Sequence, residues 1–217
     1  MKTDLQLQRD VAEELRWDPS INEKEIAIAV KDGVVTLRGT VTSYTEKFAA
    51  ELAAERVNGV RAVAEELTVQ LPGEHMRDDT DIAHAVVNAL NWDIQVPKNA
   101  VTATVEKGFV TLRGDVDWQY QKEAAASAVR RLVGVKGVSN FVRLAPVIST
   151  FDVKTKIESA LKRSAEVEAD RITVETADGK VTLKGNVRSW SERRDAERAA
   201  WQAPGVREVD DRLVITA

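Results

Sequence analysis

A basic residue stands at the same place in three similar segments of the sequence, at Arg38, Arg113 and Lys184. Each follows Thr-Leu and precedes glycine, within an alternating run whose apolar positions predict a strand. The cation is therefore expected on the outward side of that strand. Three matched cations on a regular scaffold can contact lipid phosphates or an acidic partner. The alternative is a solvated strand position, or a salt bridge between repeats.

Aromatic residues form a second candidate site, between this strand and a following helix. Rings with one apolar and one polar side suit membrane interfaces and partner surfaces. The alternative is that they pack the helix entrance or lie buried between neighbouring units. Arginines flank Trp190, which makes it the best single surface patch. The full set of candidates for lipid or partner binding is Arg38, Tyr44, Arg113, Trp118, Tyr120, Lys184, Arg188, Trp190, Arg193 and Arg194.

Two further tryptophans, Trp17 and Trp92, occupy matched positions. Each comes two residues after a leucine of a predicted amphipathic helix. We expect both to lie in the core or at an interface.

Residues for catalysis or for a resident cofactor do not emerge from the sequence. There is no cysteine, which excludes disulfides and thiolate ligands. The two histidines, His75 and His84, fall in a predicted linker and on a predicted helix, so convergence on a metal is not expected. Carboxylates recur at no matched, pocket-like offset, and no Gly-Lys-Ser/Thr phosphate loop is present. The sequence predicts a non-enzymatic protein without cofactor or metal.

The composition is that of a globular protein: 43% of the 217 residues are hydrophobic and 30% are charged. A net charge of −4 argues against nucleic acid as a partner. No run approaches the roughly 20 apolar residues of a membrane-spanning helix. The first fifteen residues carry charges where a signal peptide needs an apolar centre. We therefore expect a cytoplasmic protein, or a periplasmic one if a leader was removed.

Internal repetition is the strongest signal in the chain. The segments beginning at Gly33, Gly108 and Gly179 read GVVTLRGTV, GFVTLRGDV and GKVTLKGNV. Nine of the eleven glycines fall on repeated positions, which chance does not produce. The glycines that follow these segments at a constant interval are Gly59, Gly134 and Gly205.

The flanks of each segment predict the same elements three times. An apolar stripe at helical spacing comes first, as in Leu7, Val11 and Leu15. A hairpin with glycine in its turn follows, then an alanine-rich helix and a last strand. Ser43, Asp117 and Ser189 are expected to cap the second helices, and the later glycine to end them.

We predict an α+β fold of three tandem αββαβ domains, each a three-stranded mixed sheet with two helices on one face. The expected domains are 1–72, 77–146 and 147–217. Proline-marked linkers are expected at 70–77 and 145–149.

This pattern resembles the BON domain, the bacterial osmotically inducible and nodulation-associated domain. The likeness rests jointly on the strand Asp-Gly-Val-Val-Thr-Leu-Arg-Gly-Thr-Val, the alanine-rich helix and the later Val-x-Gly-Val, and it covers nearly the whole chain. The resemblance implies αββαβ units, a role in envelope or osmotic stress, and binding of phospholipid or membrane surfaces. It offers no catalytic residues, and some members are associated with potassium.

Three functions follow as hypotheses. The first is a stress-associated, membrane-peripheral protein whose repeats bind phospholipid headgroups or an envelope partner. The second is a protein–protein scaffold or a self-associating module, because half-covered sheets leave faces that need neighbours. The third is binding of a small cation such as potassium through backbone carbonyls.

Overall fold

The computed structural model describes residues 2–145, 153–164 and 169–216, and it contains the same unit three times. The first repeat consists of α1 (Asp4–Trp17), η1 (Glu23–Glu25), β1 (Ile26–Lys31), β2 (Val34–Val41), α2 (Tyr44–Arg56) and β3 (Ala62–Val69). The second has α3 (Asp79–Trp92), β4 (Val101–Glu106), β5 (Phe109–Val116), α4 (Gln119–Arg130) and β6 (Gly137–Leu144). The third has α5 (Val153–Arg163), η3 (Ala169–Arg171), β7 (Ile172–Ala177), β8 (Lys180–Val187), α6 (Trp190–Trp201) and β9 (Glu208–Ile215).

Each repeat builds its own mixed sheet. The middle strand pairs antiparallel with the strand before it and parallel with the strand after it, in the orders β1-β2-β3, β4-β5-β6 and β7-β8-β9. A parallel pair needs a crossover connection, and the alanine-rich helix supplies it. Three mixed sheets and six α-helices confirm the α+β fold expected from the sequence.

The core of each repeat lies between its sheet and its two helices. In the first repeat the stripe Leu7, Val11 and Leu15 is buried together with Val35 and Leu37 of β2. The second helix turns fully buried alanines toward the same core, among them Ala50, Ala53 and Ala54. Small side chains let this helix approach the sheet closely, which is why alanine recurs there.

A close backbone approach explains the middle glycine of each segment. A Cβ atom on Gly39, whose φ is +141°, would collide with the carbonyl oxygen of Glu25. Gly114 and Gly185 stand in the same relation to the carbonyls of Ala100 and Arg171. Only glycine fits where the strand passes this carbonyl.

The starts of the second helices agree only in part with the expectation. The Ser43 and Ser189 hydroxyls accept hydrogen bonds from the backbone N–H groups of Glu46 and Glu192, as predicted. The prediction for Asp117 was wrong: Trp118 is the N-cap residue of α4. The Gln121 side chain instead accepts from the backbone N–H groups of Asp117 and Trp118, each at 3.0 Å.

The later glycines, Gly59, Gly134 and Gly205, are not the C-cap residues of these helices. Helix α2 ends at Arg56 and its C-cap is Val57 in an extended conformation, so Gly59, with φ of +101°, shapes the turn that leads into β3. The first predicted linker contains a short 3-10 helix, η2 (Gly73–His75). Most of the second, from residue 146 onward, lies outside the described residues.

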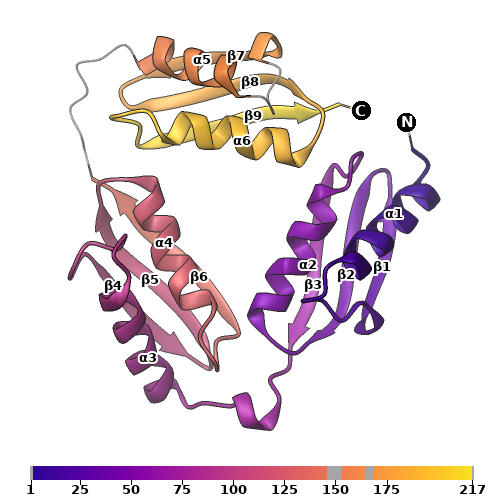
Figure 1. Ribbon diagram of the computed structural model, residues 1–217, viewed down its shortest axis with the longest axis vertical. Coiled ribbons are helices and arrows are strands. Elements are labelled where there is room, and N and C mark those ends of the chain that lie inside the picture. Colours follow the sequence, from indigo (N-terminus) through magenta and orange to yellow (C-terminus); the bar gives the residue numbers. More distant parts are fainter. Residues whose placement is uncertain (1, 146–152, 165–168, 217) are drawn as a thin grey trace.

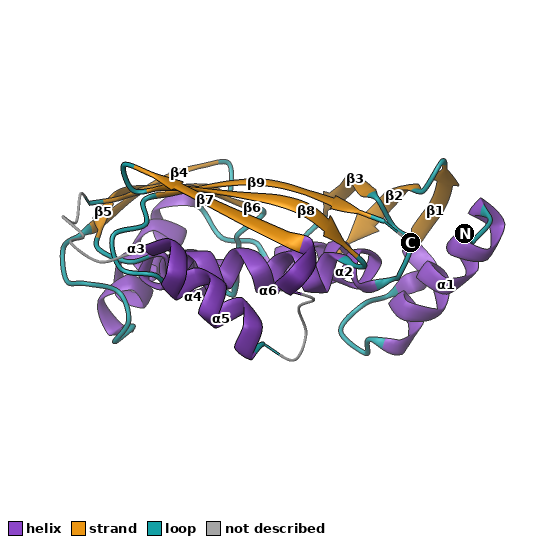
Figure 2. Ribbon diagram, turned by 90° about the horizontal axis from the view of Figure 1, so that it is seen from above, coloured by secondary structure: helices purple, strands orange, loops and turns teal. Residues whose placement is uncertain are grey.

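The three repeats are arranged as a ring (Figure 1). The second helices α2, α4 and α6 lie toward the centre, and the first helices α1, α3 and α5 lie toward the outside. Seen from above after a 90° turn, the sheets occupy one layer and the helices the other (Figure 2). The second helices therefore face one another, and one face of each sheet stays open.

Candidate functional site

The interfaces between repeats reuse the same two helix positions. One is held by Phe48, Glu123 and Arg194 in the three repeats, and the other, seven residues later, by Glu55, Arg130 and Trp201. In each interface the earlier position of one repeat lies near the later position of the next, with the third repeat followed by the first. The chain thus forms a cyclic arrangement in which equivalent positions carry different chemistry.

The interface between the first and second repeats combines a cation with two aromatic rings. The Arg130 guanidinium carbon lies 3.5 Å from the centroid of the Phe48 ring. Tyr44, at the start of α2, packs against the core of the second repeat. Burial lowers the pKa of Arg130, while the neighbouring Tyr44 hydroxyl acts in the opposite direction. This interface is an aromatic contact with a desolvated cation.

The interface between the third and first repeats is an ion pair beside a tryptophan. Arg194 Nη1 lies 2.6 Å from Glu55 Oε2. Burial raises the pKa of Glu55, and Arg194 opposes that shift. Trp190, at the start of α6, packs against the core of the first repeat. The Arg193 guanidinium lies 4.9 Å from the Trp190 ring centroid, and its Nε is 2.6 Å from Asp211 Oδ2.

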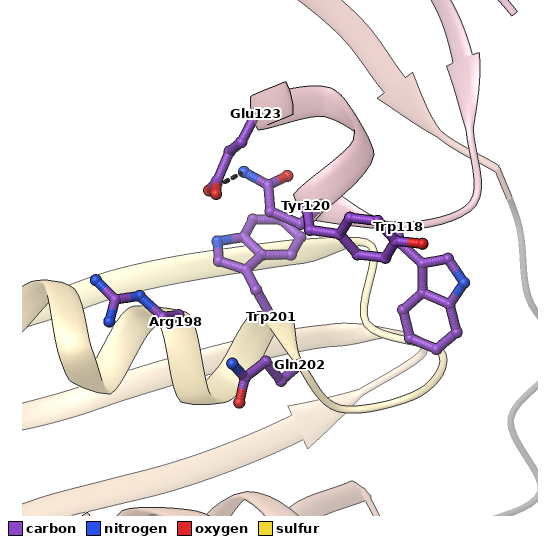
Figure 3. Close-up of a pocket in the computed structure, with 7 residues that line it drawn as sticks. Trp118, Tyr120, Glu123, Arg198, Trp201 and Gln202 are labelled. Atoms are coloured by element: carbon purple, nitrogen blue, oxygen red, sulfur yellow. Dashed lines mark hydrogen bonds between the residues drawn. The ribbon is translucent and has the colours of Figure 1, made fainter. Parts of the chain in front are cut away.

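The interface between the second and third repeats is open. At the start of α4 the equivalent of Tyr44 and Trp190 is Gln119, which lines a groove of about 440 Å³ (Figure 3). Three aromatic rings from the two repeats, one carboxylate and one guanidinium share this groove. Its lining residues are Trp118, Gln119, Tyr120, Glu123, Arg198, Trp201 and Gln202.

The three matched cations of the second strands lie on the open sheet faces, where each has a neighbour. Arg38 forms an ion pair with Glu66, its register partner on β3. Arg113 lies 5.9 Å from the Phe141 ring centroid, and Lys184 Nζ is 2.6 Å from Glu175 Oε2. These pairs form within one sheet, and none of them joins two repeats.

The remaining candidates are divided between the interfaces and the surface. Arg188, just before α6, is exposed, and its Nε lies 3.6 Å from Oε2 of Glu192 in the first turn of that helix. Arg193, Arg194, Tyr44 and Trp190 are half-buried at or beside contacts between repeats. Tyr120 is 52% exposed on the rim of the groove. The structure therefore separates residues that the sequence treats as one patch.

Of the two places expected for Trp17 and Trp92, the core is wrong, and an interface stays a prediction. Their side chains are 84% and 88% exposed, and Ile94, two residues after Trp92, is 99% exposed. A signal for this was present in the sequence. Trp17 follows the buried Leu15 by two residues, or about 200° around a helix, so it faces away from the buried stripe.

Within the part of the chain that the structure describes, no three His, Asp or Glu residues are grouped so that they could hold a metal ion. Among the same residues no helix has the length and apolar character needed to cross a bilayer.

Two curated bacterial proteins are similar to this chain in sequence. Osmotically-inducible protein Y of Escherichia coli (strain K12) is 32% identical over 125 residues, which are 56% of this chain and 62% of that protein. The chain therefore spans less than two thirds of this relative. Outer membrane lipoprotein DolP of Haemophilus influenzae is 29% identical over 139 residues, 61% of this chain and 72% of that protein.

A solved structure, the C-terminal domain of CdsD from the type III secretion system of Chlamydia trachomatis, aligns over the full length of both chains. Its sequence identity is 15% and its TM-score is 0.28, too low to establish a common arrangement. The BON domain model matches residues 3–70, 78–146 and 149–217. With nearly its whole length matched in three copies, the chain belongs to the BON domain family.

Proposed function

We propose that this chain is a non-enzymatic, stress-associated binding protein that docks on phospholipid surfaces of the bacterial envelope through the ends of its first helices. The observation that carries this proposal is the matched pair of exposed tryptophans, Trp17 and Trp92. Both stand at the last position of a first helix, in consecutive repeats, and neither contributes to the cores.

An exposed indole is costly in water and favourable at a membrane interface. Its ring is largely apolar, and its N–H can bond to headgroups or water. Partial burial of one indole in the headgroup region is worth about 2 kcal/mol. Ile94 adds a second apolar side chain beside Trp92. Together these residues suit reversible docking.

The proposal predicts a docking mode that depends little on salt. The net charge of −4 gives no overall attraction to anionic lipid. The cations Arg38, Lys184 and Arg194 already have acidic neighbours. Binding of lipid phosphates by the matched cations remains a prediction, and in this proposal it is secondary to insertion of the tryptophans.

The names of the two relatives support an envelope location for this protein. One is by name osmotically inducible and the other is by name an outer membrane lipoprotein. We therefore favour an envelope location over the cytoplasmic one that the N-terminal sequence suggests.

Co-sedimentation with phosphatidylglycerol–phosphatidylethanolamine vesicles tests the proposal. We expect the wild-type chain to bind, and Trp17→Ala combined with Trp92→Ala to reduce binding at least tenfold. Phe141→Ala is the matched control, because Phe141 is a 61% exposed aromatic residue on the open sheet face. Absence of wild-type binding, or an equal loss in the Phe141 variant, contradicts the proposal.

One observation favours self-association as a second candidate function. Phe109 on β5 and Phe141 on β6 are 58% and 61% exposed. These strands belong to the layer opposite the helices (Figure 2). A second sheet can cover such a face. Light scattering at increasing concentration tests this, and a strict monomer contradicts it. Potassium binding remains a prediction, which a thermal-shift comparison in potassium and sodium salts addresses.

A further inference from the structure

The three interfaces of the ring can be compared position by position, and one of them lacks an aromatic side chain that the other two have. Tyr44 packs against the core of the second repeat, and Trp190 packs against the core of the first. The equivalent residue facing the third repeat is Gln119. Among the described residues, no hydrophobic side chain of the second repeat packs against the third core. The groove thus lies at the position that an aromatic ring occupies in the other two interfaces.

The walls of this groove are aromatic. Trp118 and Tyr120 come from the start of α4, and Trp201 comes from the end of α6 (Figure 3). The indole N–H of Trp201 is bonded to Glu197 of its own helix at 3.2 Å. Trp201 can therefore offer its ring to a ligand without leaving its N–H unsatisfied.

The charges in the groove are not matched across the interface. Glu123 holds the position of Phe48 and Arg194, but the residue opposite is Trp201 rather than a cation. Glu123 accepts a hydrogen bond from Gln119 Nε2 at 3.2 Å, and no ion pair to it exists among the residues that the structure describes. Within the described part of the chain, Arg198 forms an ion pair only along its own helix, with Asp195 at 3.1 Å.

We propose that this groove binds a zwitterion with a quaternary ammonium group. Aromatic faces attract a trimethylammonium group through cation–π interactions, and they suit it better than a strongly hydrated inorganic cation. Glu123 supplies a negative charge in the groove that can balance the positive charge of the trimethylammonium group. Arg198 can hold the anionic end of the same molecule through a charge-assisted hydrogen bond. The site does not depend on Trp17 or Trp92, so it stands apart from the membrane proposal.

Isothermal titration calorimetry on the full chain tests the assignment with glycine betaine and phosphocholine. Glycine is the control ligand, since it has the same zwitterionic form without the methyl groups. We expect saturable binding of the methylated ligands and none of glycine. Vesicles of phosphatidylcholine, compared with phosphatidylglycerol on a chain that carries Trp17→Ala and Trp92→Ala, distinguish a lipid headgroup from a free solute without the docking proposed above. Equal binding of glycine, or no saturable binding of any methylated probe, overturns the proposal.

Three variants locate the site. Gln119→Trp introduces the aromatic residue that the other interfaces contain and is expected to abolish binding while leaving the fold intact. Glu123→Gln is expected to weaken binding about tenfold. Glu106→Gln, which removes an exposed carboxylate outside the groove, is the control and is expected to bind like the wild type. Unchanged affinity in both groove variants overturns the proposal.

Discussion

Arg194 of the third repeat and Glu55 of the first, 139 residues apart in the chain, form an ion pair of 2.6 Å that closes the ring. The Arg194 side chain is 31% exposed and that of Glu55 is 16% exposed. No linker joins these two repeats directly. Their contact therefore depends on α2 and α6 and on the packing of Trp190 against the first core.

Arg194→Ala should open this interface. It leaves a half-buried carboxylate without its cation, which costs about 1–2 kcal/mol after allowance for partial exposure. A double-mutant cycle with Glu55→Ala, followed by chemical unfolding, measures the coupling free energy. Small-angle scattering should show a larger radius of gyration.

The exposed pair Arg38–Glu66 provides the control cycle. Its side chains are 65% and 50% exposed, and we expect about 0–1 kcal/mol of coupling. If the two cycles give equal coupling, the ion pair does not hold the ring closed.

Two half-buried carboxyl groups of α2, Glu51 and Glu55, should favour the folded state increasingly as the pH falls from neutral. Burial raises the pKa of Glu51 and of Glu55 above the ordinary carboxyl value of 4.5. A carboxyl whose folded pKa is raised contributes stability that is fully present below its unfolded pKa and is lost as pH rises through the folded pKa. From neutral pH downward, these two groups therefore contribute increasing stability.

Glu51→Gln removes one of the two groups. It should raise the thermal midpoint at neutral pH and flatten its pH dependence above 4.5. The measurement is calorimetry at several pH values, with Glu74→Gln, an exposed carboxylate in the first linker, as the control. A Glu51→Gln profile identical to the wild-type profile would refute this assignment.

Gly39→Ala should unfold the first repeat or come close to it. The added methyl group meets the Glu25 carbonyl at a φ of +141°, a combination expected to cost about 3 kcal/mol or more. Gly73→Ala is the matched control, since nothing lies within 4 Å of a Cβ added there. Circular dichroism during urea unfolding checks both variants. Equal stability would mean that the close approach at Gly39 is not needed for the fold.

The two kinds of tryptophan should respond differently to truncation. Trp190→Ala removes a ring packed on the first core and should cost about 2–3 kcal/mol. Trp92→Ala removes an exposed side chain and should change the free energy of unfolding by less than about 0.5 kcal/mol. Urea unfolding compares them. A large loss for Trp92→Ala would show that its side chain is packed in solution.

Most helices and strands of each repeat can be predicted from the sequence, because the residue patterns that specify them are local. The stripe Leu7, Val11 and Leu15 marks a helix by its spacing, and the hairpin glycines mark turns by the backbone they require. The prediction for the start of α4 failed because a neighbouring side chain makes the capping hydrogen bonds there. At the start of α4, Gln121 satisfies the backbone groups that Asp117 was expected to serve.

The sequence by itself determined the threefold αββαβ fold, since periodicity and turn geometry act over a few residues and recur in every copy. Only the tertiary structure decided how the copies meet. Positions such as Phe48, Glu123 and Arg194 are equivalent in the repeat but unlike in chemistry, so no pattern marks them as contacts. Their partners lie in another repeat, and which rings become buried, exposed or lined up in a groove depends on the packing of α2, α4 and α6.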